Sequence, residues 1–261
     1  MDTKTIRFTI DRGIGTLTMN RPENLNAINL EMLDEMLRAI FSCTNNRDVR
    51  VIIIKGEGRA FSSGGDIKVM ENILDRDAYT FMHDWIQRVH LLEMQLRTIP
   101  KPVIASIRGV ASGQGMNLAL ACDLRIASES ASFNQSFVRL GLTSEGTYFL
   151  SRLVGVGKAT ELFFTGATIS AAEAMSLGIL NRVVPDEQLE AETMKWAEQM
   201  ATGPTEALGR TKLLINSGYK NQLDQHLAQE STLIAETART EDFREAVKAF
   251  LEKRDPEFRG M

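Results

Sequence analysis

Residues 105–127 read ASIRGVASGQGMNLALACDLRIA, and this stretch decides the fold. The pattern predicts a buried strand, a glycine turn, an apolar helix and a second strand, in that order. Gly109, Gly113 and Gly115 fall within seven residues, and glycine allows the positive φ angles and close backbone approaches that such turns require. We expect the helix to be buried, with its free N-terminal amides facing a pocket. Such amides can stabilise an anion or an oxyanion, although a tight turn without chemistry would read the same.

A second glycine turn follows the apolar strand at residues 51–54. Residues 60–68 read AFSSGGDIK, which again predicts a turn followed by the start of a helix. Asp66 suits the N-cap or first turn of that helix, where a carboxylate meets free amides. Two such turns could supply one N–H group each to a single carbonyl oxygen, which is what a two-donor oxyanion hole needs.

Five motifs, in this order and spacing, resemble the enoyl-CoA hydratase/isomerase (crotonase) superfamily over about residues 6–258. They are NRPENLNA at 20–27, AFSSGGDI at 60–67, KPVIA at 101–105, the stretch 109–123, and GILNRVV at 178–184. The resemblance implies an α/β fold with a crotonase-like ββα spiral core at residues 1–185 and a helical C-terminal region at 186–261. It also implies homotrimers, often paired into hexamers. The N–H groups of Gly65 and Gln114 would then grip the carbonyl oxygen of a coenzyme A thioester.

The composition indicates an ordinary soluble enzyme. Of the 261 residues, 43% are hydrophobic and 25% are charged, and the net charge of −4 argues against a nucleic-acid-binding face. No apolar run is long enough for a membrane span, and the N-terminus has no signal-peptide core. Cys43 and Cys122 lie in apolar helical patterns, so we expect free thiols and a cytoplasmic location. The sequence shows no metal-ligand cluster and predicts no cofactor beyond the coenzyme A of the substrate.

Hydrophobic periodicity predicts strands alternating with helices, hence parallel β units. Residues 6–19 predict a hairpin, and Asn29 the N-cap of a helix whose apolar positions include Phe41. A strand at 50–55, a long amphipathic helix at 78–98 and a strand at 103–107 follow. The C-terminal region then predicts four helices, at 186–202, 204–217, 222–238 and 241–253.

Two positions where the family's hydratases carry glutamate hold other residues here. The motif matches place Asn117 at the first position and Phe137 at the second. Hydration requires activation of water and protonation of a carbon, and neither side chain can serve as the acid or base. We therefore expect very poor hydratase activity.

One acid remains in a turn that feeds a helix. Glu145 in GLTSEGT (141–147) resembles the aspartate that some isomerases of the family use as a base. Apolar neighbours such as Phe137, Leu140 and Leu142 should raise its pKa, which favours a base able to return a proton to carbon. The other interpretation is an acid that only interacts with the helix dipole. One carboxylate suffices for a 1,3-proton shift.

The sequence therefore predicts an acyl-CoA isomerase, with Glu145 as the acid/base and the Gly65 and Gln114 amides as the oxyanion hole. The alternatives are an enoyl-CoA hydratase that uses Glu145 with water, and a non-catalytic member that binds coenzyme A esters. His83 and His90 share one helix face and are expected on the surface or the pocket wall. Expected pocket residues are Asn117, Phe137 and Leu142, and expected contacts to coenzyme A are Asn26, Ala27, Gly64, Gly65, Asp66, Ile67, Lys68, Lys253 and Phe258.

Overall fold

The larger of two β-sheets begins with the predicted hairpin. In the computed structural model, which describes residues 3–71, 73–74 and 77–260, β1 (Ile6–Asp11) and β2 (Ile14–Met19) pair antiparallel. Four later strands add in parallel, in the order β1-β2-β3-β4-β6-β9. Parallel neighbours need crossover connections, and these connections hold the helices that build the site. The added strands are β3 (Val51–Gly56), β4 (Val103–Ile107), β6 (Leu124–Ser128) and β9 (Arg182–Val184).

A smaller sheet contains three short strands, and the chain forms each of them between strands of the larger sheet. Its strands are β5 (Val110–Ser112), β7 (Ser132–Asn134) and β8 (Ile169–Ser170). The chain passes from β4 to β5 through Gly109, where φ is +61° and a Cβ atom would lie only 2.0 Å from the carbonyl oxygen of Arg59. Only glycine fits there. The transfer of consecutive strands between two sheets is the predicted ββα spiral.

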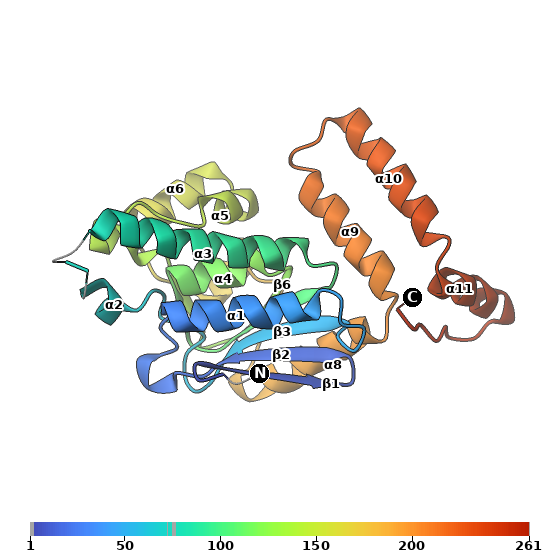
Figure 1. Ribbon diagram of the computed structural model, residues 1–261, viewed down its shortest axis with the longest axis horizontal. Helices are drawn as coiled ribbons and strands as arrows, with labels where there is room; N and C mark the ends of the chain where they lie inside the picture. The colour runs from blue at the N-terminus through green and yellow to red at the C-terminus, as the bar shows by residue number, and fades with distance from the viewer. Residues whose placement is uncertain (1–2, 72, 75–76, 261) are drawn as a thin grey trace.

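Helices cover both faces of the larger sheet. On one face lie α1 (Leu30–Cys43), α3 (Ala78–Thr98) and α4 (Gln114–Ala121), and on the other lies α8 (Leu189–Ala201) (Figure 1). Each face has its own hydrophobic core, and the larger core contains all the buried apolar residues of α4. The predicted burial of the helix after the glycine turn at residues 109–115 is confirmed, since every residue of α4 is buried.

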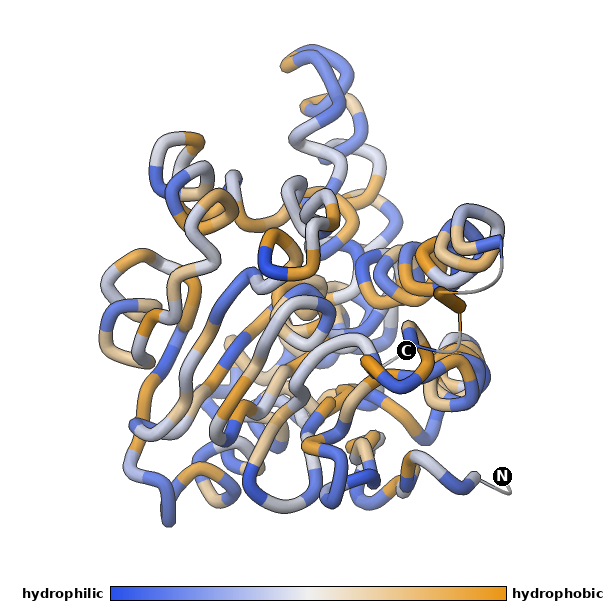
Figure 2. Tube along the Cα trace, turned by 90° about the vertical axis from the view of Figure 1, so that its left-hand side faces the viewer, coloured by the Kyte–Doolittle hydropathy of each residue, from blue (hydrophilic) through white to orange (hydrophobic). Residues whose placement is uncertain are grey.

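Short helices and turns complete the site end of the molecule. They are α2 (Ile67–Glu71), α5 (Thr147–Val154), α6 (Val156–Thr165) and α7 (Ala171–Ser176), with 3₁₀ turns η1 (Pro22–Asn24), η2 (Ser136–Leu140) and η3 (Asp186–Gln188). Many of the hydrophobic residues lie along the strands and helices that cross the middle of the molecule (Figure 2).

The last three helices extend away from the spiral. They are α9 (Thr205–Ser217), α10 (Leu223–Thr237) and α11 (Glu241–Glu252) (Figure 1). Within residues 186–261, α8 packs on the sheet through its buried Leu189, Ala197 and Ala201. Across the described ranges, we find no helix with the length and hydrophobicity that crossing a membrane requires.

Local sequence signals predict several boundaries well. The Asn29 side chain accepts a hydrogen bond from the Met32 N–H at 2.9 Å and caps α1, and α3 spans the predicted residues 78–98. Cys43 and Cys122 are buried free thiols, as expected. One prediction is wrong: Phe41 is 71% exposed, because it lies outside the arc of α1 that faces the sheet.

Candidate active site

The two glycine turns meet, as an oxyanion hole requires. A Cβ atom at Gly64, where φ is +99°, would lie 2.7 Å from the Ser112 carbonyl oxygen and 3.5 Å from the Gln114 nitrogen. The turns are joined by backbone hydrogen bonds from the Ser62 N–H to the Val110 carbonyl and from the Ser112 N–H to the Ser62 carbonyl, at 3.1 and 3.0 Å. The first turn therefore lies against the N-terminus of α4.

The Gly65 and Gln114 amides are both available as donors. The Ile28 N–H donates to the Gly64 carbonyl, and the Asp66 N–H donates to the Ile28 carbonyl. The Gly65 N–H lies between these two hydrogen bonds and takes part in neither. Gln114 is the first residue of α4, so its N–H has no acceptor within the helix. Within the described part of the chain, neither N–H donates a hydrogen bond. This geometry fits two donors aimed at one carbonyl oxygen.

The Gln114 side chain folds over this hole. It is only 3% exposed, and its Oε1 atom would lie 3.1 Å from a Cβ atom at Gly65. That oxygen is buried and has no hydrogen-bond partner among the described residues. The side chain therefore narrows the cavity above the amides and offers a polar atom to whatever lies there.

Glu145 lies at the wall of the cavity, and Asn117 holds it there. Gly146, with φ of +75°, packs so closely that a Cβ atom would lie 2.0 Å from Asn117 Oδ1. The Asn117 Nδ2 donates a long hydrogen bond of 3.5 Å to Glu145 Oε2, while Asn117 Oδ1 accepts from Gln135 Nε2 at 2.8 Å. Asn117 is thus oriented by Gln135 and positions the carboxylate.

Burial makes Glu145 a base suited to neutral pH. The side chain is 6% exposed, and desolvation raises its pKa to about 7, opposed by the hydrogen bond from Asn117. The predicted direction of the shift is therefore confirmed. Of the predicted apolar neighbours, Phe137 and Leu142 line the same cavity, whereas Leu140 is exposed and is not part of the lining. The Glu145 carboxylate lies toward His90 on the cavity wall.

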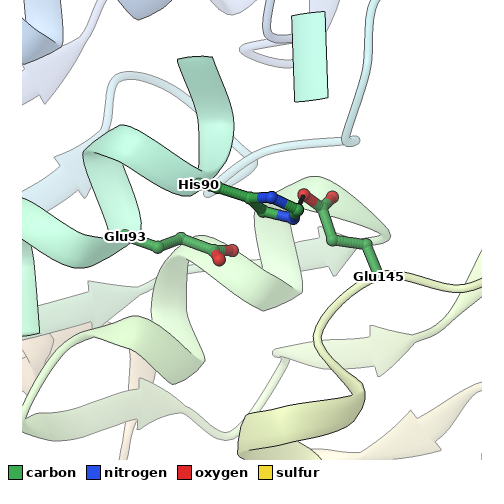
Figure 3. Close-up of side chains that lie close together, drawn as sticks. All are labelled: His90, Glu93 and Glu145. Atoms are coloured by element: carbon green, nitrogen blue, oxygen red, sulfur yellow. Dashed lines mark ion pairs between the residues drawn. The ribbon is translucent and has the colours of Figure 1, made fainter. Parts of the chain in front are cut away.

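Two residues of α3 face Glu145 across the cavity. His90 and Glu93 project from one helix toward the loop that bears Glu145 (Figure 3). The His90 Nε2 lies 3.5 Å from Glu145 Oε1, and one donor atom from each of the three side chains lies within 4.8 Å of the others. Burial, and then the charge of Glu145, raise the pKa of Glu93 to about 9.

These three side chains are the set that could hold a metal ion in the described residues. Without a cation, burial and the charge of Glu145 keep Glu93 protonated near neutral pH. A bound divalent cation would lower the pKa values of both carboxylates, so the set can hold either a proton or a cation.

The cavity between α3, the first residue of α4, α5 and the C-terminal end of α9 has a volume of about 960 Å³. That volume is within the usual range for small-molecule sites. Its apolar lining suits an acyl chain and its few charged side chains could fix one end. The lining includes Met70, Met82, Ile86, Met94, Phe137, Leu142 and Phe149, with Arg97 and Lys220 as the cations.

The residues expected to contact coenzyme A are not all brought together in one chain. Asn26 is buried, and its side chain bonds to the Glu57 and Ala60 carbonyl groups, while Ala27 is also buried. Gly64, Gly65 and Asp66 surround the hole, and the exposed Ile67 and Lys68 begin α2 beside it. By contrast, α11, which ends just before Lys253, lies at the opposite end of the molecule from α2 (Figure 1). The carbonyl oxygen of Phe258 accepts a hydrogen bond of 3.2 Å from Arg50, which directly precedes β3.

Sequence reasoning missed two features of this site. Arg21 Nη1 forms an ion pair of 2.8 Å with Asp66 Oδ2, next to the first glycine turn. Glu93 was not singled out, although it occurs four residues after Val89 within the apolar stripe of α3. A carboxylate in an apolar stripe was the signal that could have found it. Both histidines are exposed, but His90 lines the cavity and His83 does not.

The spiral of two sheets, with two glycine turns meeting at a buried helix, defines a crotonase-fold protein. A family model described as enoyl-CoA hydratase/isomerase matches residues 9–261, and the chain belongs to that family.

Its relatives include both activities. The chain is 38% identical to the short-chain-enoyl-CoA hydratase of Clostridium acetobutylicum, with 92% of each protein covered. It is 34% identical to the trans-2-decenoyl-[acyl-carrier-protein] isomerase of Streptococcus mutans, with 100% of each covered. The crystal structure of an enoyl-CoA hydratase from Bacillus anthracis superimposes with a TM-score of 0.94 at 31% identity, covering 99% of this chain and 100% of that one.

Proposed function

We propose that this protein is an isomerase that shifts a double bond in an enoyl thioester. The Gly65 and Gln114 amides hold the thioester carbonyl oxygen, and Glu145 moves the proton. The observation that carries the proposal is the carboxylate of Glu145, buried at the cavity wall with a pKa of about 7. The motif resemblance supports it, because it assigns Asn117 and Phe137 to the positions where the family's hydratases carry glutamate. The relatives include both an isomerase and a hydratase, so the choice between these two reactions has to rest on the chemistry of the site.

The reaction starts when Glu145 removes a proton from the carbon next to the thioester carbonyl. The electron pair moves onto the carbonyl oxygen, and the two amides stabilise the resulting enolate. Because the substrate has a double bond one carbon further along, the charge is shared with the γ carbon. Protonation there gives the conjugated 2-enoyl product. A well-placed base contributes about 10²–10⁴-fold to such a rate.

The first test is product analysis in D₂O. Purified protein would be incubated separately with a 3-enoyl-CoA and a 2-enoyl-CoA, using wild type, Glu145→Gln and the control Glu187→Gln, whose carboxylate is exposed on η3. We expect wild type and the control to convert the 3-enoyl ester, and Glu145→Gln to lose at least a hundredfold in rate.

Formation of 3-hydroxyacyl-CoA from the 2-enoyl ester, without movement of the double bond, would make the protein a hydratase and overturn the proposal. Tight binding without deuterium uptake would instead indicate a protein that binds coenzyme A esters and does not convert them. Repeating the assay with an acyl-carrier-protein thioester tests which carrier the site accepts.

We also propose that coenzyme A lies along Asn26, Ala27, the Gly64–Lys68 turn and, from a neighbouring subunit, Lys253 and Phe258. Exposed apolar residues of the last helices, such as Leu227, Ile234 and Phe250, support packing into a trimer or hexamer. Light scattering tests this through a mass that is a multiple of the 29.1 kDa chain. The free thiols support the cytoplasmic location that the proposal retains.

A further inference from the structure

Glu93 is a buried carboxylic acid that the single-acid reaction does not use. It projects from α3 into the same cavity as Glu145 (Figure 3). The whole residue is 7% exposed, and its Oε1 atom is buried with no hydrogen-bond partner within the described ranges. A buried polar atom without a partner is unfavourable and calls for an explanation.

The distances place Glu93 beside Glu145 in the same cavity. One carboxylate oxygen of Glu93 and one of Glu145 lie within 4.8 Å of each other and of His90. Two buried carboxylates this close do not both ionise readily, so one of them holds a proton. Glu93 is the one that holds it, because Glu145 accepts a hydrogen bond from Asn117 and lies 3.5 Å from His90 Nε2, and both contacts favour an ionised Glu145. The Glu93 Oε1 atom has no hydrogen-bond partner among the described residues.

We propose that Glu93 is a second catalytic acid, which donates a proton to the γ carbon of the substrate while Glu145 removes one from the α carbon. The inference rests on the isomerase function proposed above and names the proton donor of its second step. The two carboxyl groups come from opposite walls of the cavity, the helix α3 and the loop before α5.

The proton balance closes over one turnover. Glu145 begins ionised and Glu93 protonated. The α C–H bond breaks and Glu145 takes that proton, while a C–H bond forms at the γ carbon with the proton from Glu93. Glu145 then ends protonated and Glu93 ionised, and transfer of one proton across the short gap between them, directly or through solvent in the open cavity, restores the starting state.

The other charged groups around the cavity are consistent with this arrangement. His90 faces the pair from α3, and Arg97 and Lys220 also line the cavity. Arg97 lies 3.7 Å from Asp123, and its Nη2 donates to the Asn216 side chain, so its charge has other partners. Glu93 has no described cation in ion-pair contact.

The experiment separates the two proton transfers. With a 3-enoyl-CoA in D₂O, exchange at the α carbon reports on Glu145, and conversion to the 2-enoyl ester reports on the complete reaction. In Glu93→Gln we expect exchange to stay within about tenfold of wild type while conversion falls by about 10²–10⁴-fold. Asp84→Asn, which removes an exposed carboxylate from the same helix, is the matched control and should retain both rates.

Each outcome bears on one claim. Conversion at the wild-type rate by Glu93→Gln would overturn the inference and leave the proposed function standing. Loss of exchange and conversion in equal proportion would also overturn it, because Glu93 would then act only by positioning Glu145. If wild type shows neither exchange nor conversion, the proposed function fails, and the inference fails with it.

Two measurements on wild type need no variant. With a 3-enoyl-CoA deuterated at the α carbon and enzyme in excess in H₂O, we expect the γ position of the product to carry hydrogen. Substantial deuterium there would show that one acid moves the same proton and would overturn the inference. Loss of conversion after EDTA treatment, with recovery on adding zinc or magnesium, would assign the cluster to a cation and overturn it as well.

Discussion

Replacing Glu93 by glutamine should change how the stability of the protein depends on pH. The folded protein keeps the Glu93 proton up to about pH 9, whereas an exposed glutamate releases it near 4.5. Between these values the folded state binds one proton more than the unfolded state. The stabilisation is therefore fully present below pH 4.5 and is lost as pH rises toward 9, with a slope of about 1.4 kcal/mol per pH unit.

The magnitude follows over a window that lies well inside both pKa values. From pH 5 to pH 7 this group alone removes roughly 3 kcal/mol from the free energy of unfolding of wild type. Glutamine has a similar shape and no titrating proton, so Glu93→Gln should not lose that amount. Glu145 also titrates, with a pKa of about 7 in wild type. Between pH 5 and pH 7 it faces an uncharged side chain in both proteins, protonated Glu93 or glutamine, so the comparison cancels most of its contribution.

Urea unfolding at pH 5, 6 and 7 measures the effect, with the fluorescence of the buried Trp85 on α3 as the signal. Protein concentration is held constant so that any oligomer contributes equally. We expect the stability of Glu93→Gln relative to wild type to rise by roughly 3 kcal/mol between pH 5 and pH 7. A difference that stays constant within about 0.5 kcal/mol would show that Glu93 titrates like a surface acid, which would refute the reasoning from burial.

Three further predictions concern the residues around the acid. Gly146→Ala should destabilise the fold by roughly 1–3 kcal/mol and displace the carboxylate, because its Cβ would clash with Asn117 at positive φ; thermal melting and conversion assays measure the two effects. Asn117→Ala removes the hydrogen bond that lowers the pKa of Glu145, so the acidic limb of the kcat/KM profile should move to higher pH; an unmoved limb would contradict that role. Arg21→Ala leaves the buried Asp66 charge unpaired and should cost about 3–5 kcal/mol in urea unfolding, whereas Arg21→Lys should cost less.

Local signals in the sequence were enough for most of the fold. In three places a local requirement of the backbone or the core selects one type of residue. These are the N-cap at Asn29, the tight turn at Gly109 and the buried apolar stripe of α3. The two glycine turns predicted only that each could supply one backbone N–H, and the family resemblance implied that the donors are Gly65 and Gln114.

The second acid could not be predicted in that way. Periodicity places Glu93 on a buried face of α3, but it does not say which element lies opposite. That partner comes from a loop about fifty residues later in the chain, whose position depends on the packing of Gly146 against Asn117. The direction of the Gln114 side chain likewise follows from contacts in the finished site and has no local signature.

The location of Glu93 argues for a role beyond packing. At this position in an apolar stripe, leucine or methionine would bury the same surface without holding a proton at a desolvated carboxyl, and burying such a group unpaired is unfavourable. Residues that reduce stability persist where function needs them. The same substitution should then have two effects of opposite sign, since Glu93→Gln should gain stability relative to wild type as pH rises and lose conversion of the 3-enoyl ester. A buried acid with no part in the reaction could give the gain in stability without the loss of conversion. Measuring both quantities on Glu93→Gln therefore distinguishes a catalytic acid from a buried acid that has no function.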